Sequence, residues 1–97
     1  MKKVVEIIAA IRAVKDELRD VYHLENIELF GSFSRGDFSL ASDVDLLVDF
    51  TGEADIFNLI GAEQFLEKEL GLAVDIVPRR ALRKEFRQEV FKEAIAV

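Results

Sequence analysis

The chain has 97 residues, of which 51% are hydrophobic and 33% are charged, and it contains five Gly, one Pro and no Cys. This length suits one hydrophobic core and excludes a two-domain enzyme, so we expect a single domain over residues 1–97. Thirteen basic and nineteen acidic residues give a formal net charge of −6, the wrong sign for a protein that binds a nucleic-acid backbone. The absence of Cys excludes disulfides and Cys-ligated zinc.

The apolar stretches are too short or too interrupted for membrane insertion or secretion. None reaches the roughly 20 uninterrupted apolar residues of a membrane span. Glu6 and Arg12 interrupt the apolar N-terminal segment, where a signal peptide would need a continuous apolar core. We therefore expect a soluble protein of the cytoplasm that does not bind membranes.

Helices are predicted in three segments, where apolar residues recur every three or four positions and so fall on one helix face. These segments are 4–22, 56–70 and 82–95. Asp55 has the residue type and position of an N-cap for the second helix, and Gly71 has those of its stop signal.

Strands are predicted in three short apolar runs that are bounded by turn residues or rich in branched side chains. The runs are 27–30, 43–50 and 72–77. Gly31 ends the first run and Pro78 ends the third. Helices and strands therefore alternate along the chain, and this order predicts an α/β domain in which helices pack on a small sheet.

Three carboxylates fall within or beside the predicted second and third strands. Asp43 and Asp45 point to the same side, because strand side chains alternate, and two like charges there would be relieved by a divalent cation such as Mg²⁺. Asp75 interrupts an apolar strand and would join them if the two strands are neighbours. The alternative is a solvated strand face on which Asp75 pairs with a nearby Arg.

A glycine-rich segment follows the first strand. Residues 31–36, Gly-Ser-Phe-Ser-Arg-Gly, can bring backbone amides and small side chains close to a phosphate. The two glycines have the spacing of a P-loop, but Asp37 and Phe38 stand where that motif needs Lys and then Ser or Thr, so a P-loop ATPase is excluded. Phe33 and Phe38 flank the segment, and we expect them to anchor it by packing.

These motifs together resemble the nucleotidyltransferase superfamily of DNA polymerase beta. The resemblance is carried by Gly31-Ser32, Arg35-Gly36, the run Ser-Asp-Val-Asp-Leu at 42–46 and Asp75 some thirty residues later. The minimal nucleotidyltransferase family is the most similar, and the resemblance covers nearly all of the chain. It implies an α+β nucleotidyltransferase domain with a mixed sheet of three strands, or slightly more, in the order 1-2-3, flanked by helices.

The resemblance also implies a role for each motif. The metal-binding and catalytic residues would be Asp43, Asp45 and Asp75, which would hold two Mg²⁺ ions, with Mn²⁺ as an alternative. Asp75 would in addition help to activate the attacking hydroxyl. The ATP-binding residues would be Gly31, Ser32, Arg35, Gly36 and Ser42. Two metals can stabilise the attacking and leaving oxygens of an in-line displacement.

Members of the minimal nucleotidyltransferase family are often encoded beside HEPN-domain ribonuclease toxins. The resemblance therefore implies an antitoxin that attaches AMP to a tyrosine of such a toxin, and the partner would supply the acceptor surface that this small domain lacks. Two alternatives stay open: an antitoxin that neutralises its partner by binding alone, and a nucleotidyltransferase that modifies a small molecule such as an antibiotic. Homo-oligomers are compatible with the sequence.

Overall fold

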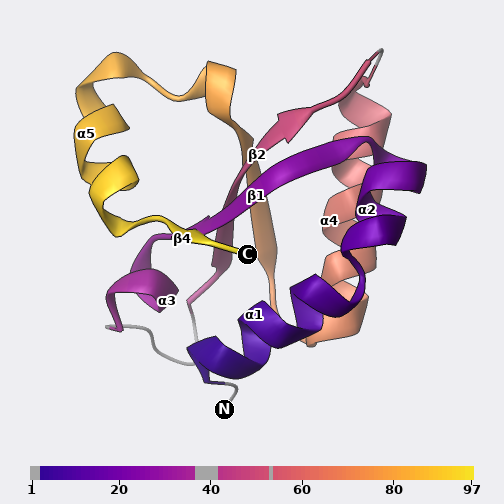
Figure 1. Cartoon of the computed structure of the whole chain (residues 1–97), viewed down its shortest axis with the longest axis horizontal. Coiled ribbons are helices and arrows are strands. Elements are labelled where there is room, and N and C mark those ends of the chain that lie inside the picture. Colours follow the sequence, from indigo (N-terminus) through magenta and orange to yellow (C-terminus); the bar gives the residue numbers. More distant parts are fainter. Residues whose placement is uncertain (1–2, 37–41, 53) are drawn as a thin grey trace.

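The computed structural model describes residues 3–36, 42–52 and 54–97. In this part of the chain four strands form one mixed sheet in the order β3-β2-β1-β4 (Figure 1). They are β1 (Leu24–Phe30), β2 (Val44–Phe50), β3 (Val74–Pro78) and β4 (Ile95–Ala96). β1 is antiparallel to β2 and β4, whereas β2 is parallel to β3. The predicted 1-2-3 order is confirmed, and β4 extends the sheet at the β1 edge.

Three helices cover one face of the sheet: α1 (Val4–Ala13), α2 (Lys15–Tyr22) and α4 (Ile56–Leu70). The predicted helix over 4–22 is in fact two helices, because Val14 leaves the helical conformation at φ −115° and ψ 12°. The break turns α2 away from the direction of α1, as Figure 1 shows, while both helices still bury residues in the same core. Among the described residues, no helix has the length and apolarity needed to cross a membrane.

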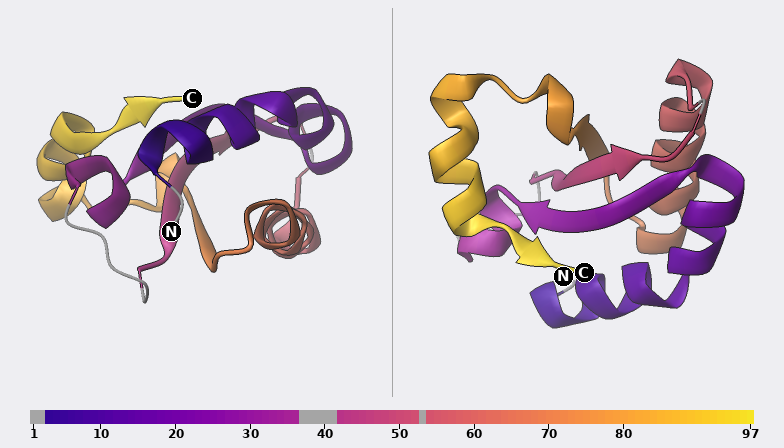
Figure 2. Two further views of the ribbon diagram at one scale, coloured as in Figure 1. Left: turned by 90° about the horizontal axis from the view of Figure 1, so that it is seen from below. Right: turned by 45° about the horizontal axis from the view of Figure 1, so that its top comes forward.

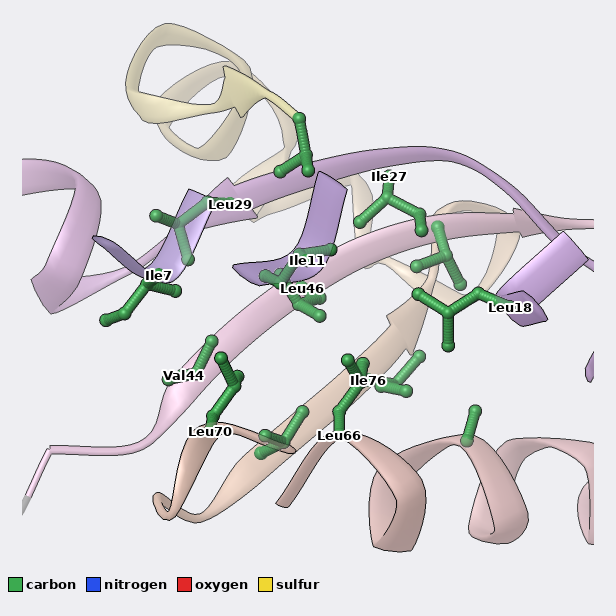
Figure 3. Packing of buried hydrophobic residues seen from close by; sticks show 14 of the residues in the cluster. Ile7, Ile11, Leu18, Ile27, Leu29, Val44, Leu46, Leu66, Leu70 and Ile76 are labelled. Atoms are coloured by element: carbon green, nitrogen blue, oxygen red, sulfur yellow. The ribbon is translucent and has the colours of Figure 1, made fainter. Parts of the chain in front are cut away.

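The hydrophobic core lies between these helices and the sheet (Figure 3). Alternate residues of β2 point into it, with Val44, Leu46 and Val48 all fully buried. The core residues drawn and labelled in Figure 3 are Ile7, Ile11, Leu18, Ile27, Leu29, Val44, Leu46, Leu66, Leu70 and Ile76. The residues between them in β2, Asp45, Leu47 and Asp49, therefore point to the opposite face, which these three helices leave open, although Leu47 is fully buried there.

The predicted ends of α4 are confirmed. The Asp55 side chain accepts hydrogen bonds from the amides of Phe57 (3.0 Å) and Asn58 (3.1 Å), and the Asn58 side chain accepts one from the Asp55 amide (2.9 Å). This reciprocal arrangement satisfies amides that have no partner within the helix. Gly71 ends the helix in the left-handed conformation at φ +68°.

The C-terminal segment differs from its prediction. Residues 82–95 were expected to form one helix, but the helix α5 spans Lys84–Glu93, follows a short 3₁₀ turn at Arg79–Ala81, and is succeeded by β4. Ala94 is extended at ψ 133°, and this redirects Ile95 and Ala96 to pair with β1. Ala94 and Ile95 have helical spacing, but both lie beyond the end of α5, and Ile95 pairs with Leu29 of β1 instead.

Candidate active site

Two of the three predicted carboxylates are direct neighbours in the sheet. Asp45 of β2 and Asp75 of β3 are register partners in the parallel pair, so their side chains leave the sheet on the same face. Asp43 lies two residues before Asp45, immediately ahead of β2. The expectation that these residues share one face of the sheet is confirmed for Asp45 and Asp75, and that face is the open one.

The β3 strand is held in register by α4. The Val74 amide donates a hydrogen bond to the Glu67 carboxylate (3.1 Å), and the Ile76 amide donates one to the Glu63 carboxylate (2.9 Å). These amides lie on either side of Asp75 and point away from β2, so the two glutamates satisfy the outer edge of the strand. The helix therefore fixes the backbone that carries Asp75, a role that the sequence analysis missed.

The glycine turn lies directly against the carboxylates. Phe30, the last residue of β1, is the register partner of Asp45, and Gly31 follows it with φ +78°. A Cβ atom at Gly31 would lie 2.2 Å from Oδ2 of Asp45. Any other residue would therefore clash with the carboxylate and would also adopt a backbone conformation that side chains disfavour.

The segment after Gly31 forms the one-turn helix α3 (Ser32–Arg35). Phe33 is 1% exposed and belongs to the core, which confirms that it anchors the segment. Ser34 donates a hydrogen bond to the Gly31 carbonyl (3.0 Å), and Gly36 ends the helix at φ +82°. Arg35 thus lines the same cavity as Asp45 and Asp75, on a turn whose apolar side is buried, and Ser32 opens that turn directly after Gly31.

The remaining predicted residues of this segment lie farther along the chain. Ser42 is half-buried and comes immediately before Asp43. Phe38, which was expected to pack beside the segment, lies outside the described residues. Of Gly31, Ser32 and Ser42, it is Gly31 whose backbone lies against Asp45.

The electrostatics of the site centre on Asp45. Burial, followed by the nearby charges of Asp75 and Asp43, raises the pKa of the Asp45 carboxyl from 3.8 to about 6. The positive charge of Arg35 acts in the opposite direction. Asp45 is thus a carboxylate whose negative charge the protein does not fully compensate, and a bound cation would compensate it.

A cavity of about 350 Å³ joins these residues to α5. One part of its lining is polar and includes Arg35, Asp45 and Asp75, and the other is an apolar stripe of Leu82, Phe86 and Val90. The C-terminal end of α5 lies next to α3 in both views of Figure 2, where Arg35 forms an ion pair with Glu93 at 3.2 Å. The sequence predicted only that the α5 residues of this lining share one helix face. Apolar residues have the same spacing on a face that packs in the core and on a face that binds a ligand.

The carboxylates of this site suit Mg²⁺ only when oxygens of a bound substrate complete the coordination of the ion. Within residues 3–36, 42–52 and 54–97, no group of three or more His, Asp and Glu side chains is arranged to hold a metal ion by itself. Mg²⁺ is usually held by one or two carboxylates together with substrate phosphates and water. The adjacent pair Asp45 and Asp75, with Asp43 nearby, fits that pattern, and the raised pKa of Asp45 favours a cation there.

Arg79, the first basic residue after β3, pairs with residues outside this site. The Arg79 guanidinium forms an ion pair with Glu28, donates to the Asn26 carbonyl at 3.0 Å and lies 3.8 Å from the Asp49 carboxylate. These partners lie on the open face toward the other end of β2. Arg79 therefore ties β3 to β1 across β2, and it is Glu28 and Asp49 that pair with it rather than Asp75.

Comparison with known proteins agrees with this geometry. Residues 11–97 match the family model of the nucleotidyltransferase domain. The chain is 38% identical over 92 residues to the protein adenylyltransferase MntA of Thermococcus cleftensis, an alignment that covers 95% of this chain and 93% of that protein. These matches span the strands and turns that carry every predicted site residue.

Solved structures give the same assignment. A protein provisionally described as a minimal nucleotidyltransferase superposes with a TM-score of 0.84 at 32% identity, covering 99% of this chain and 97% of that one. A toxin–antitoxin structure with AMP-PNP gives a TM-score of 0.70 at 26% identity, covering 98% and 72%. A tri-AMPylated HEPN toxin of Shewanella oneidensis with its MNT antitoxin gives 0.66 at 25% identity, covering 93% and 70%. The chain is a nucleotidyltransferase and belongs to the minimal nucleotidyltransferases related to the protein adenylyltransferase MntA.

Proposed function

We propose that this protein is an antitoxin of the cytoplasm that transfers AMP from ATP to a tyrosine hydroxyl of a HEPN-domain toxin. The tyrosine oxygen forms a bond to the α-phosphorus of ATP, the bond from that phosphorus to the bridging oxygen breaks, and pyrophosphate leaves. The hydroxyl proton passes to a nearby base. The similarity to MntA and to the MNT antitoxin bound to an AMPylated toxin supports this reaction.

The observation that carries the proposal is the contact between the glycine turn and the paired carboxylates. Gly31 lies against Asp45, and Asp45 lies beside Asp75 in the sheet. A triphosphate bound at the turn therefore places its α-phosphorus over the carboxylates. Phosphoryl transfer depends mainly on such positioning and on charge compensation, so a small domain can supply what the reaction needs.

We assign the following roles to the residues. Asp43, Asp45 and Asp75 hold two Mg²⁺ ions together with the nucleotide phosphates, and Asp75 lies where the attacking hydroxyl arrives. The residues that bind the triphosphate are Gly31, Ser32, Arg35, Gly36 and Ser42. When bound, the metal ions neutralise charge on the phosphate oxygens and on the attacking oxygen. Arg35 adds a positive charge at the end of the site where pyrophosphate leaves.

The decisive measurement is the intact mass of a HEPN-domain toxin after incubation with the chain, ATP and Mg²⁺. A gain of one or more AMP units is expected with the wild type and is lost in the Asp43→Asn/Asp45→Asn variant. Asp49→Asn is the matched control, because Asp49 lies on the same strand and the same face of the sheet but pairs with Arg79. Unchanged transfer by the double variant would exclude the assigned site.

The same experiment separates catalysis from binding. If the wild type forms a stable complex with the HEPN protein but adds no mass, the protein neutralises its partner by binding alone. Transfer to an antibiotic in the absence of any partner would instead assign a small-molecule acceptor. The proposed function requires mass gain on the protein partner that depends on Asp43 and Asp45.

A further inference from the structure

The helix α5 carries an apolar stripe that its own chain leaves unburied. Phe86 and Val90 lie four residues apart on α5 and line the cavity together with Leu82, which precedes the helix, yet none of the α5 residues, all of which the structure describes, is buried. Phe86 is 50% exposed. Apolar side chains gathered along one wall of a cavity gain stability when a ligand covers them.

The stripe and the glycine turn line the same cavity. Glu93, at the C-terminal end of α5, pairs with Arg35 beside the turn. Phe86 is seven residues earlier, which places it about 10 Å along the helix axis from Glu93. A ligand whose charged end lies at Arg35 can therefore extend past the carboxylates and reach Phe86 with its other end.

We propose that this stripe binds the adenine base of ATP, with Phe86 stacking on the ring and Leu82 and Val90 flanking it. The inference rests on the proposed function, which places the triphosphate at Gly31 and Arg35. The lining carries the carboxylates of Asp45, Asp75, Glu89 and Glu93 and the guanidinium of Arg35, so the anionic end of a nucleoside triphosphate would bind there together with its metal ions. The flat ring at its other end has apolar faces that suit the stripe. Aromatic side chains stack well on any nucleobase.

The polypeptide acceptor is the less suitable occupant of the stripe. The cavity connects the stripe to the phosphate end within a single space, which suits one elongated ligand. One nucleotide fills both ends at once. Binding energy at the base would then help to hold the α-phosphorus over the carboxylates, because both ends of the nucleotide are fixed.

The test is calorimetric binding of the ATP analogue AMP-PNP with Mg²⁺, which needs neither an acceptor nor turnover. Replacing an aromatic side chain that stacks on a base weakens binding by about fivefold to 150-fold, and the partial exposure of Phe86 places the expected loss for Phe86→Ala at the lower end, about fivefold to 20-fold. Phe91→Ala is the matched control, since Phe91 is on the same helix, is 49% exposed and does not line the cavity. We expect Phe91→Ala to leave the affinity unchanged and Phe86→Tyr to retain it.

Inorganic tripolyphosphate, which has no base, provides the second probe. Its affinity should be the same in the wild type and Phe86→Ala, because only the ring contact is removed. Equal AMP-PNP affinity in the two alanine variants would overturn the inference, as would an equal loss of AMP-PNP and tripolyphosphate affinity in Phe86→Ala. So would a Phe86→Ala variant that binds AMP-PNP normally and fails only with the protein acceptor.

These outcomes are separate from a failure of the proposed function. A wild-type chain that binds AMP-PNP but transfers nothing to the HEPN protein would refute the transfer reaction. The effect of Phe86→Ala on AMP-PNP affinity would still decide whether the stripe binds the base.

Discussion

Removing the charge of Asp45 should stabilise the metal-free protein even as it abolishes transfer. The pKa of this carboxyl is raised from 3.8 to about 6 by burial and by the charges of Asp75 and Asp43. The folded protein therefore binds the Asp45 proton more tightly than the unfolded chain does, and its stability falls as the pH rises from about 4 to about 6. Asparagine has the same shape as aspartate without the charge, so the Asp45→Asn variant does not lose stability over this pH range.

The magnitude follows from the shift. About two pKa units correspond to about 3 kcal/mol, and partial solvent access reduces this to roughly half, about 1.5 kcal/mol. For a domain of this size that is a rise in Tm of about 6–12 °C at pH 8. At pH 4 the wild-type carboxyl is itself protonated, and the difference should be close to zero.

The assay is thermal unfolding of the wild type and Asp45→Asn in EDTA at pH 8 and pH 4. Asp49→Asn is the control on the same strand, and it should be destabilised because the Asp49 carboxylate accepts a hydrogen bond from Asn26 at 3.1 Å. Adding Mg²⁺ and AMP-PNP at pH 8 should stabilise the wild type more than Asp45→Asn. A less stable Asp45→Asn variant at pH 8, or a difference that persists at pH 4, would refute the electrostatic reasoning.

Three further substitutions test the surroundings of the site. Gly31→Ala should abolish transfer and lower the free energy of unfolding by about 1–3 kcal/mol, since its Cβ would lie 2.2 Å from the Asp45 carboxylate; urea unfolding that matches the wild type would contradict this. Glu93→Gln removes the charge paired with Arg35 at 3.2 Å, and calorimetry should show up to about fivefold tighter AMP-PNP binding, whereas weaker binding would mean that the pair holds α5 in place. Asp55→Ala should lower the free energy of unfolding by about 1 kcal/mol with transfer unchanged, because it removes the N-cap bonds of α4; an unaltered urea midpoint would show that the cap contributes nothing.

The sequence predicted the parts of the site that depend on local geometry. Alternation along a strand was enough to predict the face of the sheet that carries Asp45, and the glycine pattern located the turn. Both arguments needed only residues a few positions apart. The pairing of Asp45 with Asp75 needed β2 and β3 to be neighbours, and the resemblance to a known family supplied that expectation.

The parts that the sequence did not predict depend on distant contacts. β4 forms because Ile95 and Ala96 pair with the edge of β1. The helical spacing of the preceding residues gave no indication of this strand. Glu63 and Glu67 appeared to be ordinary helix-surface charges until α4 was placed beside the edge of β3. The stripe on α5 had the spacing of a buried helix face, and only the structure separates an apolar face that is buried from one that lines a cavity.

The unfavourable charge at Asp45 and the capacity to bind a nucleotide with its metal ions have one physical origin. The backbone of Asp45 is fixed beside that of Asp75, because β2 and β3 are hydrogen-bonded in register and α4 holds the outer edge of β3. The Asp45 carboxylate also cannot move toward Gly31, whose backbone already lies against it. The repulsion among the carboxylates therefore persists in the free protein, and a cation that relieves it gains that energy on binding. A domain too small for a separate substrate lobe can in this way gain affinity for a nucleotide and its metal ions from the repulsion among its own carboxylates.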